Sequence, residues 1–332
     1  MSFTDRIKDE LLSIEYEDTE EKRGFLLGAI KAIGVLEIKK SGIAVVFSCY
    51  NYGLIMKIAG IIKALYRTEL NVSRTGQADD KKGFLYTLSV PSSKAKNVLE
   101  DTKTAVLMDG EIIGFKSDFD SEIYKNEKAL KAVVRALFIS AGNAYVPSKI
   151  DLSEEELTNK SEGYRIEFVF EDENLALSVC ELLQFLSNKI KVIERQRSYV
   201  VYAKDSGLIC DIFAWLGANN GVLELNDIIV ERTVSNEMNR MNNCSLANID
   251  KTVNAGLKQI KAIEYIQMTV GLDKIADNLK EIALLRIAKP SATLTELEDE
   301  LGGRITKSGI NHRLRKIVEL AEELKNKNGD NQ

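Results

Sequence analysis

The feature that most constrains the fold is a weak internal repeat that covers residues 21–220. Hydrophobic periodicity gives the first copy, about residues 21–110, a helix at 23–34, a strand at 42–48, a helix at 52–65, a hairpin of 70–74 with 84–90, and a helix at 93–99. The second copy, about residues 127–220, has a helix at 128–141, a strand at 164–170, a helix at 173–186, a hairpin of 191–195 with 199–203, and a helix at 206–216. Each half is therefore predicted as α-β-β-α-β-β-α, and residues 21–228 as an α+β domain with a pseudo-two-fold axis.

Small residues mark the opening helix of each copy. They are Gly28, Ala29, Ala32 and Gly34 in the first helix, and Ala136, Ser140, Ala141 and Gly142 in the second. Two helix backbones without bulky side chains between them can approach closely. We therefore predict that these helices pack together where the two halves meet.

Residues 1–20 precede the repeat and predict a short amphipathic helix, with Phe3, Ile7, Leu11 and Ile14 at helical spacing. The pattern indicates a helix that packs on the domain or faces a partner. It carries no chemical group that suggests catalysis.

The C-terminal residues 273–326 predict an all-α helix-turn-helix domain. A first helix at 273–289 directs Ile275, Leu279, Ile282 and Leu285 inward and ends at Pro290. A second helix begins with the capping box Thr293-x-x-Glu296 and buries Leu294, Leu297 and Leu301 before the turn at Gly302 and Gly303. A tight glycine turn that leads into a basic third helix is the helix-turn-helix pattern.

The third helix, about residues 307–324, separates apolar from polar side chains. Its apolar stripe consists of Ile310, Leu314, Ile317, Ala321 and Leu324, whereas Ser308, Asn311, His312 and Arg315 lie on a face that could contact bases. Between residues 304 and 318 there are five cations, Arg304, Lys307, Arg313, Arg315 and Lys316, and no acid, although the net charge of the whole chain is −5. An acid-free first turn suits a helix that approaches phosphate with its N-terminus. An ordinary solvated basic face is the alternative.

Residues 229–272 join the two domains and are rich in asparagine. Because asparagine is unfavourable inside helices, residues 236–254 are expected to be a loop or to find specific hydrogen-bond partners. Arg240 and Lys251 are candidate contacts to phosphate or sugar, and a polar seam between domains is the alternative. A long helix is predicted at 246–267, with Ile249, Val253, Leu257, Ile260 and Ile263 on its apolar side and a break at 269–272. Residues 327–332 are expected to be a disordered tail.

The sequence lacks the motifs that are typical of several functional classes. Cys49, Cys180, Cys210 and Cys244 are scattered, without the close spacing of zinc or redox sites. His312 is the only histidine, which argues against a histidine metal cage or a Ser-His-Asp set, and no glycine-rich nucleotide loop occurs. We therefore expect no metal and no cofactor. No apolar run is long enough to cross a bilayer, so we expect a soluble cytoplasmic protein that does not act at the membrane.

Further basic residues lie near the ends of the predicted hairpins. They are Lys39, Lys40, Arg74, Lys81, Lys82, Lys191, Arg195 and Arg197, interleaved with the acids Glu37, Asp79, Asp80 and Glu194. These turns are expected to be mainly solvated, and contact with DNA phosphates is the alternative.

The duplicated unit resembles the single-chain LAGLIDADG homing endonucleases, in which paired helices with terminal glycines each precede β-β-α-β-β-α. In that family, an acidic residue directly before the last glycine of each helix binds the catalytic metal. Alignment on Gly34 and Gly142 places Ile33 and Ala141 at these positions. Neither side chain can ligate a metal or activate water, so the resemblance implies a nuclease fold that has lost its chemistry.

Two further motifs make the resemblance more specific. The run Asn-Arg-x-x-Asn-Cys-x-x-Ala-Asn-x-x-Lys-Thr at 239–252, and Lys-Ser-Gly-Ile-Asn-His-Arg-Leu-Arg-Lys at 307–316, are similar to segments of the WhiA family of bacterial regulators. This resemblance covers nearly the whole chain. It implies a non-catalytic transcription regulator that binds double-stranded DNA at the nucleoid and acts in sporulation, or in cell division and chromosome segregation. Other transcription factors and RNA polymerase components are further candidate partners.

The sequence thus predicts base contacts from Ser308, Asn311, His312 and Arg315, with Arg304, Lys307, Arg313 and Lys316 on phosphates. Two other classes of function stay open at this point. One is a metal-dependent DNA endonuclease of the homing type, and the other is a protein-interaction scaffold whose basic helix binds an acidic partner.

Overall fold

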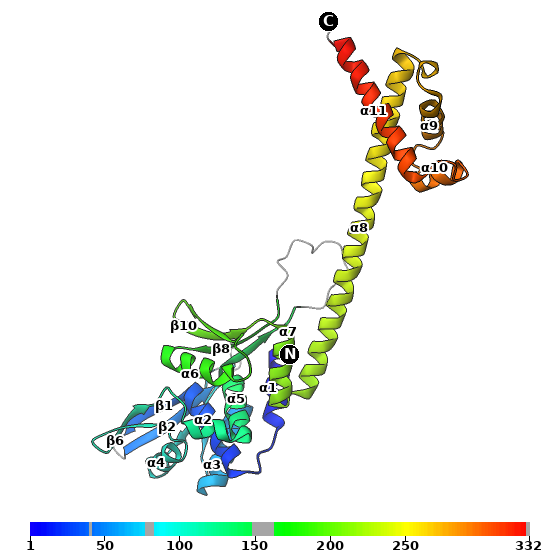
Figure 1. Cartoon of the computed structure of the whole chain (residues 1–332). Coiled ribbons are helices and arrows are strands. Elements are labelled where there is room, and N and C mark those ends of the chain that lie inside the picture. Colours follow the sequence, from blue (N-terminus) through cyan, green and yellow to red (C-terminus); the bar gives the residue numbers. More distant parts are fainter. Residues whose placement is uncertain (40–41, 77–82, 148–162, 330–332) are drawn as a thin grey trace. The chain divides into compact units, whose positions relative to one another are not determined.

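The computed structural model describes residues 1–39, 42–76, 83–147 and 163–329 (Figure 1). The chain divides into two compact units, Met1–Arg232 and Thr233–Gln332.

The first unit contains the duplicated order that the sequence predicts. The first copy consists of α2 (Thr19–Ile33), β1 (Gly34–Lys39), β2 (Gly42–Cys49), α3 (Tyr52–Tyr66), β3 (Val72–Thr75), β4 (Leu85–Val90) and α4 (Ser92–Asp101). The second consists of α5 (Glu127–Ala141), β7 (Gly142–Tyr145), β8 (Arg165–Phe170), α6 (Glu173–Gln184), β9 (Lys191–Arg195), β10 (Ser198–Ala203) and α7 (Ser206–Leu216). The prediction of two α-β-β-α-β-β-α halves is therefore confirmed, although the sequence pattern located only one of the two strands, β2 or β8, between the first two helices of each half.

Each half builds one four-stranded antiparallel sheet, and the two sheets have the same topology. The strand orders are β1-β2-β4-β3 and β7-β8-β10-β9. In the first sheet, Val45 pairs with Leu36 on one side and with Val90 on the other. Val45 and Phe47 are fully buried two residues apart, because alternate strand residues point to the same face and that face lies against helices.

The helices α2 and α5 pack against each other through their small residues. A Cβ added at Gly28 would lie 2.4 Å from the Val133 carbonyl oxygen and 2.8 Å from the Ala136 Cβ, and one at Gly24 would lie 2.4 Å from the Ala129 oxygen. This confirms the predicted role of Gly28 and Ala136 and adds Gly24. Gly34 and Gly142 are different, because they cap the C-termini of their own helices.

Helix α1 (Phe3–Ser13) confirms the predicted amphipathic helix, although it ends before residue 20. Its Ser2 and Asp5 form a capping box, and it buries Phe3, Ile7 and Leu11. A Cβ added at Gly221 would collide with the Ile7 side chain, which shows how closely α1 packs on the start of α8 (Asn219–Thr269).

The sequence prediction missed a hairpin and a short 3-10 helix between the two copies. The hairpin consists of β5 (Ala105–Met108) and β6 (Glu111–Phe115), and the 3-10 helix is η1 (Ser121–Lys125). Asp109 and Gly110 form the turn with φ of 51° and 83°. An Asp-Gly pair between apolar residues is a strong hairpin signal that was available in the sequence.

The second unit takes in most of one long helix and three shorter ones. Its elements are the later part of α8 (Asn219–Thr269), η3 (Leu272–Lys274), α9 (Asp277–Ala288), α10 (Leu294–Glu300) and α11 (Lys307–Gly329). The predicted break at 269–272 is confirmed, with Gly271 at φ 83°. Helix α9 begins four residues later than predicted because η3 occupies the start of that segment. Helix α11 continues past the predicted end at 324 to Gly329, so residues 327–329 are helical where a disordered tail was expected. Residues 330–332 lie outside the described part of the chain.

Two predictions for α8 are wrong. Of the two expectations for the asparagine-rich segment 236–254, the loop is wrong because the segment is helical, and the helix begins at Asn219 rather than at 246. Asparagine costs at most about 0.7 kcal/mol per helical position, and extending an existing helix needs no new nucleus. The predicted apolar side is also only partly buried, since Ile249, Val253 and Leu257 are exposed and only Ile263 is fully buried.

The core of the second unit joins α8, α9, α10 and α11. Its fully or nearly fully buried members are Ala262, Ile263, Ile266, Ile282, Ala283, Ala292, Leu297, Leu301, Ile310, Leu314, Ile317 and Ala321. The predicted stripe of α11 is thus confirmed, with Leu324 partly buried at its end.

Candidate nucleic-acid interface

The turn between α10 and α11 is built from local hydrogen bonds. The Glu296 N–H donates to Thr293 Oγ1 at 3.2 Å, and the Glu296 carboxylate accepts from the Thr293 N–H at 2.6 Å, as the predicted capping box requires. The Thr293 N–H also lowers the pKa of Glu296. Gly302 and Gly303, with φ of 60° and 73°, then turn the chain into α11.

Thr306 caps α11, which the sequence reasoning missed although threonine is a favoured N-cap residue. The Gly309 N–H donates to Thr306 Oγ1 at 3.3 Å, and the Ile310 N–H donates to the Thr306 carbonyl at 2.9 Å. The first turn of α11 contains no acid. A Cβ added at Gly309 would lie 3.1 Å from Ile305 Cγ2, so the glycine allows Ile305 to fold back on the first turn.

Six of the eight predicted contact residues are exposed on α11. They are Lys307, Ser308, Asn311, His312, Arg315 and Lys316. Ser308, His312 and Arg315 are four and three residues apart, so they share the side of the helix opposite the buried stripe. Lys307 and Asn311 lie on one flank of this side and Lys316 on the other. We call these six residues the polar face of α11.

The other two predicted contacts, Arg304 and Arg313, point toward α9. Arg304 pairs with Glu281 at 3.2 Å and donates to the Leu301 carbonyl at 3.2 Å. Arg313 is half-buried and donates to the Asn278 carbonyl at 3.4 Å. Both side chains therefore link the turn and α11 to α9, and Arg304 would have to leave Glu281 to reach a phosphate.

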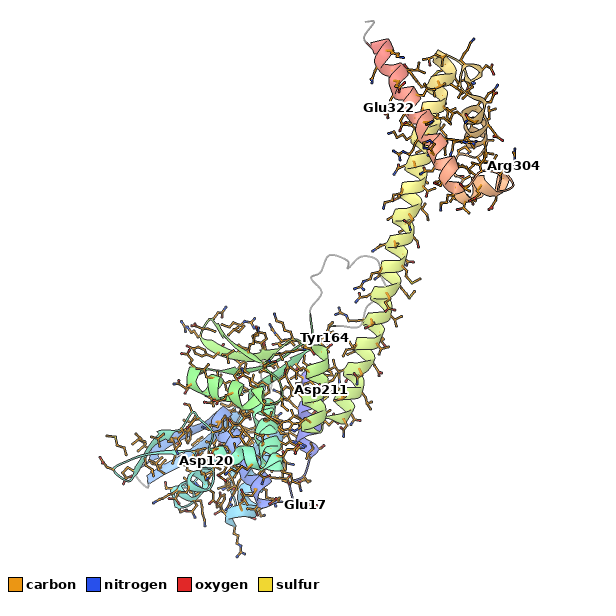
Figure 2. The ribbon with its side chains drawn as sticks, viewed as in Figure 1. Glu17, Asp120, Tyr164, Asp211, Arg304 and Glu322 are labelled. Carbon is orange, nitrogen blue, oxygen red and sulfur yellow. The ribbon has the colours of Figure 1, made fainter. Side chains whose placement is uncertain are left out.

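Acidic residues limit the polar face toward the C-terminus of α11. Glu319, Glu322 and Glu323 are exposed, and Glu322 pairs with Lys258 of α8 at 3.2 Å. Arg304 lies in the turn, and Glu322 lies well along α11 (Figure 2). A polyanion is therefore attracted to the first turns of the helix and repelled beyond Lys316.

The buried Arg286 fixes the loop between α9 and α10. Arg286 is only 3% exposed and donates through Nη1 to the Ala292 carbonyl at 2.6 Å, which ties the loop between α9 and α10 to α9. Burial lowers the pKa of its guanidinium. Gly256 of α8 lies under the same loop, since an added Cβ would be 2.9 Å from the Pro290 oxygen. The sequence alone does not indicate that this arginine is buried, because an arginine in an amphipathic helix is usually exposed.

The two secondary candidates, Arg240 and Lys251, are exposed on α8. They are eleven residues apart, about three helical turns, and therefore face the same side of the helix. No hydrogen bond to either side chain is found among the described residues.

The positions of the lost acids are equivalent in the two halves. Ile33 ends α2 directly before the cap Gly34, and Ala141 ends α5 directly before Gly142. Both side chains are half-buried. Nowhere in the described ranges do three His, Cys, Asp or Glu side chains gather closely enough to hold a metal ion.

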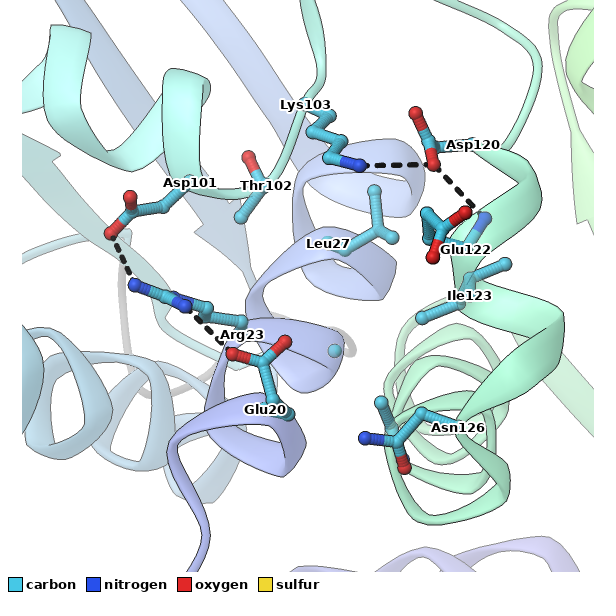
Figure 3. Close-up of a pocket in the computed structure, with 12 residues that line it drawn as sticks. Glu20, Arg23, Leu27, Asp101, Thr102, Lys103, Asp120, Glu122, Ile123 and Asn126 are labelled. Atoms are coloured by element: carbon cyan, nitrogen blue, oxygen red, sulfur yellow. Dashed lines mark hydrogen bonds and ion pairs between the residues drawn. The ribbon is translucent and has the colours of Figure 1, made fainter.

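A small cavity of about 110 Å³ lies at the other end of these helices (Figure 3). Its charged groups pair with one another: Arg23 contacts Glu20 at 2.7 Å and Asp101 at 3.4 Å, and Lys103 contacts Asp120 at 3.1 Å. Glu20 and Ile33 are separated by about 20 Å along α2, so the cavity is remote from the lost nuclease positions.

The structure describes the side chains of four of the basic residues near the hairpin ends. Arg74 lies over the Phe84 ring, 4.8 Å from its centroid, and Lys191, Arg195 and Arg197 are exposed. Lys40, Lys81 and Lys82 lie outside the described residues, as does the side chain of Lys39.

Comparison with known proteins places this architecture. A family model described as the WhiA LAGLIDADG-like domain matches residues 22–81 and 130–235, and one described as the WhiA C-terminal HTH domain matches residues 238–321. The chain belongs to the WhiA family. A WhiA from a Thermoanaerobacter species, named probable cell division protein WhiA, is 36% identical over 329 residues, which cover 98% of each chain.

A second relative and a solved structure agree with this assignment. The WhiA of Clostridium beijerinckii, with the same printed name, is 31% identical over 326 residues, covering 98% of this chain and 99% of its own. The crystal structure of full-length WhiA from Thermatoga maritima is similar with a TM-score of 0.54 and 26% identity, covering 97% of this chain and 99% of that one. These matches confirm the family and the fold that the sequence motifs predict. Within the described residues, no helix has the length and apolar character needed to cross a bilayer.

Proposed function

We propose that this WhiA chain is a transcription regulator that binds double-stranded DNA through the N-terminal half of α11. The observation that carries the proposal is the polar face of α11, which is exposed, cationic and free of acids, and which follows a tight turn. The chain as a whole has a net charge of −5, so this local excess of cations stands out. Proteins bind DNA largely through such local positive charge.

In the proposed complex, α11 enters the major groove. Asn311 suits the edge of adenine, and Arg315 can donate two hydrogen bonds to guanine, while Ser308 and His312 offer adaptable contacts. Lys307 and Lys316 flank this row and contact phosphates on either side. The N–H groups of Lys307 and Ser308 have no acceptor within the helix and add a place for a phosphate oxygen.

Arg304 and Arg313 take a secondary part in this proposal. Their bonds to Glu281 and to the Asn278 carbonyl orient α11 on α9. Arg304 can contact a phosphate only after its ion pair with Glu281 breaks. Arg240 and Lys251 remain secondary candidates for DNA contact on α8.

We infer that the LAGLIDADG-like unit is a non-catalytic platform, since Ile33 and Ala141 offer no ligand where the resemblance expects metal-binding acids. Incubation of the purified protein with supercoiled plasmid and Mg²⁺ tests this inference. Unchanged supercoiled plasmid is the expected result, and nicked or linear DNA that disappears with a chelator would overturn it.

The proposed process is cell division and chromosome segregation, or sporulation, with the protein cytoplasmic and associated with the nucleoid. The printed names of the relatives support cell division. RNA polymerase components or other transcription factors are proposed partners. A genome-wide binding profile with the recovered DNA sites would identify the regulated genes.

Gel retardation with genomic fragments over a range of salt concentrations tests DNA binding itself. Binding that weakens steeply with salt is expected, because cations on α11 displace counterions from phosphates. If the basic helix instead binds an acidic protein, no salt-dependent retardation will appear, and the proposal fails.

A further inference from the structure

One stripe of α8 is partly buried and partly uncovered. Its members recur every three or four residues: Val234, Met238, Met241, Ser245, Ile249, Thr252, Gly256, Gln259, Ile263 and Ile266. This spacing keeps all ten on one side of the helix. The last four are buried against the helix-turn-helix core, whereas the first five are exposed and Thr252 is half-buried. The same apolar side therefore continues beyond the core that covers it.

The uncovered part contains large hydrophobic side chains. Met238, Met241 and Ile249 are 58%, 70% and 57% exposed, and Val234 is 51% exposed. Single exposed apolar residues are ordinary, but a continuous stripe of them along one helix is typical of an interaction surface. The segment is also rich in asparagine, so local propensity alone supports the helix only weakly.

We propose that residues 238–252 of α8 pair antiparallel with the same segment of a second copy of the chain. A two-fold axis through Ser245 would place Met241 opposite the partner's Ile249, Met238 opposite the partner's Thr252, and Ser245 opposite itself. Met238 then meets the smaller Thr252, the flexible Met241 meets Ile249, and the small Ser245 pair at the axis lets the two helices approach closely. The contact is isologous and therefore closed, so it gives a dimer and no larger array.

Charge favours the same arrangement. The segment 234–252 contains two acids, Glu237 and Asp250, and two bases, Arg240 and Lys251, so two copies do not repel each other. Glu237 and Lys251 lie on the same flank of the stripe, and in an antiparallel pair each flank meets the equivalent flank of the partner. Glu237 of one copy then lies beside Lys251 of the other. The uncovered part of the stripe itself contains no charged residue, which separates this proposal from the role of α11.

Sedimentation velocity of the full chain without DNA gives the first test. We expect a concentration-dependent species at twice the 37.1 kDa mass of one chain. Met241→Glu would place a carboxylate against the partner's Ile249 in two layers of the contact, and should raise the dimer dissociation constant at least tenfold. Asn243→Glu, on the side of α8 that faces away from the stripe, is the matched control and should leave the mass unchanged. A wild-type chain that stays at the monomer mass at all concentrations overturns the proposal.

Disulfide trapping tests the antiparallel register. One protein carries Met238→Cys and another Thr252→Cys, both with Cys244→Ser, so that the exposed native thiol is removed. On oxidation, a covalent dimer should form when the two are mixed and should be at least tenfold less abundant with either protein alone. Asn243→Cys, on the side of α8 that faces away from the stripe, is the background control for the remaining native thiols. Trapping of Met238→Cys with itself would show a parallel pair and overturn the proposed register.

Discussion

At the residue scale, cations divide into two groups that the sequence alone does not distinguish. Lys57 and Arg135 are turned inward and donate to main-chain carbonyls, Lys57 to Leu12 at 3.1 Å and Arg135 to Leu216 at 2.7 Å, and Arg286 does the same in the second unit. The cations of the polar face of α11 instead point into solvent. A cationic side chain that hydrogen-bonds a carbonyl at a helix end stabilises the fold. Of the two groups, only the cations of the polar face of α11 are therefore free to bind a polyanion.

Arg315→Ala should weaken binding to the specific DNA site by about 1–3 kcal/mol, roughly 5- to 150-fold. The loss arises because Arg315 is the only arginine of the polar face, and its planar guanidinium matches the two acceptors of a guanine edge. Fluorescence anisotropy with the specific duplex and a scrambled duplex measures it, and discrimination between the two should fall as well. Lys325→Ala removes the same charge beyond the acidic limit of the polar face and should bind like the wild type.

Lys307→Ala should behave differently from Arg315→Ala. A phosphate contact carries no sequence information, so affinity should fall equally for both duplexes, and the magnitude of the slope of log K against log salt should decrease by about 1. Equal behaviour of the two variants would contradict the division into base and phosphate contacts. Wild-type affinity of Arg315→Ala would contradict the orientation proposed for α11.

Lys31 of α2 supplies a pH-dependent prediction. Its Nζ donates to the Asp118 carbonyl at 2.7 Å and to the Lys116 carbonyl, and burial lowers its pKa to about 8. The unfolded chain therefore binds this proton more tightly than the folded chain between pH 8 and about 10.4. Below pH 8 the burial of the charged Lys31 ammonium lowers the free energy of unfolding by its full amount. This destabilisation decreases as the pH rises from 8 to about 10.4.

The stability of the wild type relative to Lys31→Met should accordingly rise between pH 7 and pH 9.5, as measured by denaturant unfolding at both pH values. The difference in unfolding free energy between the two proteins does not contain the contribution of groups that titrate alike in both. A difference that is constant or decreases with pH would show that the ammonium group is not destabilised by burial.

At the element scale, the pattern of the sequence predicts most of the fold. Period-two strands and period-3.6 helices give both halves of the first unit, and the capping box with Gly302 and Gly303 gives the turn before α11. The failures have physical causes. The helical state of 236–254 depends on continuation from neighbouring turns, and the positions of Arg304 and Arg313 depend on Glu281 and Asn278 across the fold. A short stretch of sequence shows neither the continuation of a helix from its neighbouring turns nor a contact with a residue far away in the chain.

The close approach of α2 and α5 yields a prediction at this scale. Gly28→Ala should destabilise the first unit by about 1–3 kcal/mol, because the new methyl group meets the Val133 oxygen and the backbones must separate. Denaturant unfolding followed by the fluorescence of Trp215 measures the change. Gly60→Ala is the matched control: its site in α3 has no heavy atom within 4 Å, and the substitution should stabilise by about 0.5–1 kcal/mol. Equal stability of Gly28→Ala and wild type would show that the junction is loosely packed.

At the scale of the whole molecule, two separate cores share one chain. The core of the first unit extends from Phe3 to Leu225, and that of the second from Ala262 to Ala321. Between them, α8 has a segment, residues 236–251, in which every side chain is exposed. Cooperative unfolding requires shared packing, so we expect the two units to unfold independently.

The only tryptophan of the chain, Trp215, makes this expectation testable. It packs against Phe185 with ring centroids 5.6 Å apart, inside the first unit, so its fluorescence reports that unit, while far-ultraviolet circular dichroism reports helices of both. Leu314 is fully buried in the second core, and Leu314→Ala should cost that core about 2–5 kcal/mol. Thermal unfolding followed by circular dichroism should then gain an earlier phase, while the fluorescence midpoint stays at its wild-type value. An equal shift of both signals would mean that α8 couples the two cores into one cooperative unit, because the cavity left by Leu314 has no direct contact with Trp215.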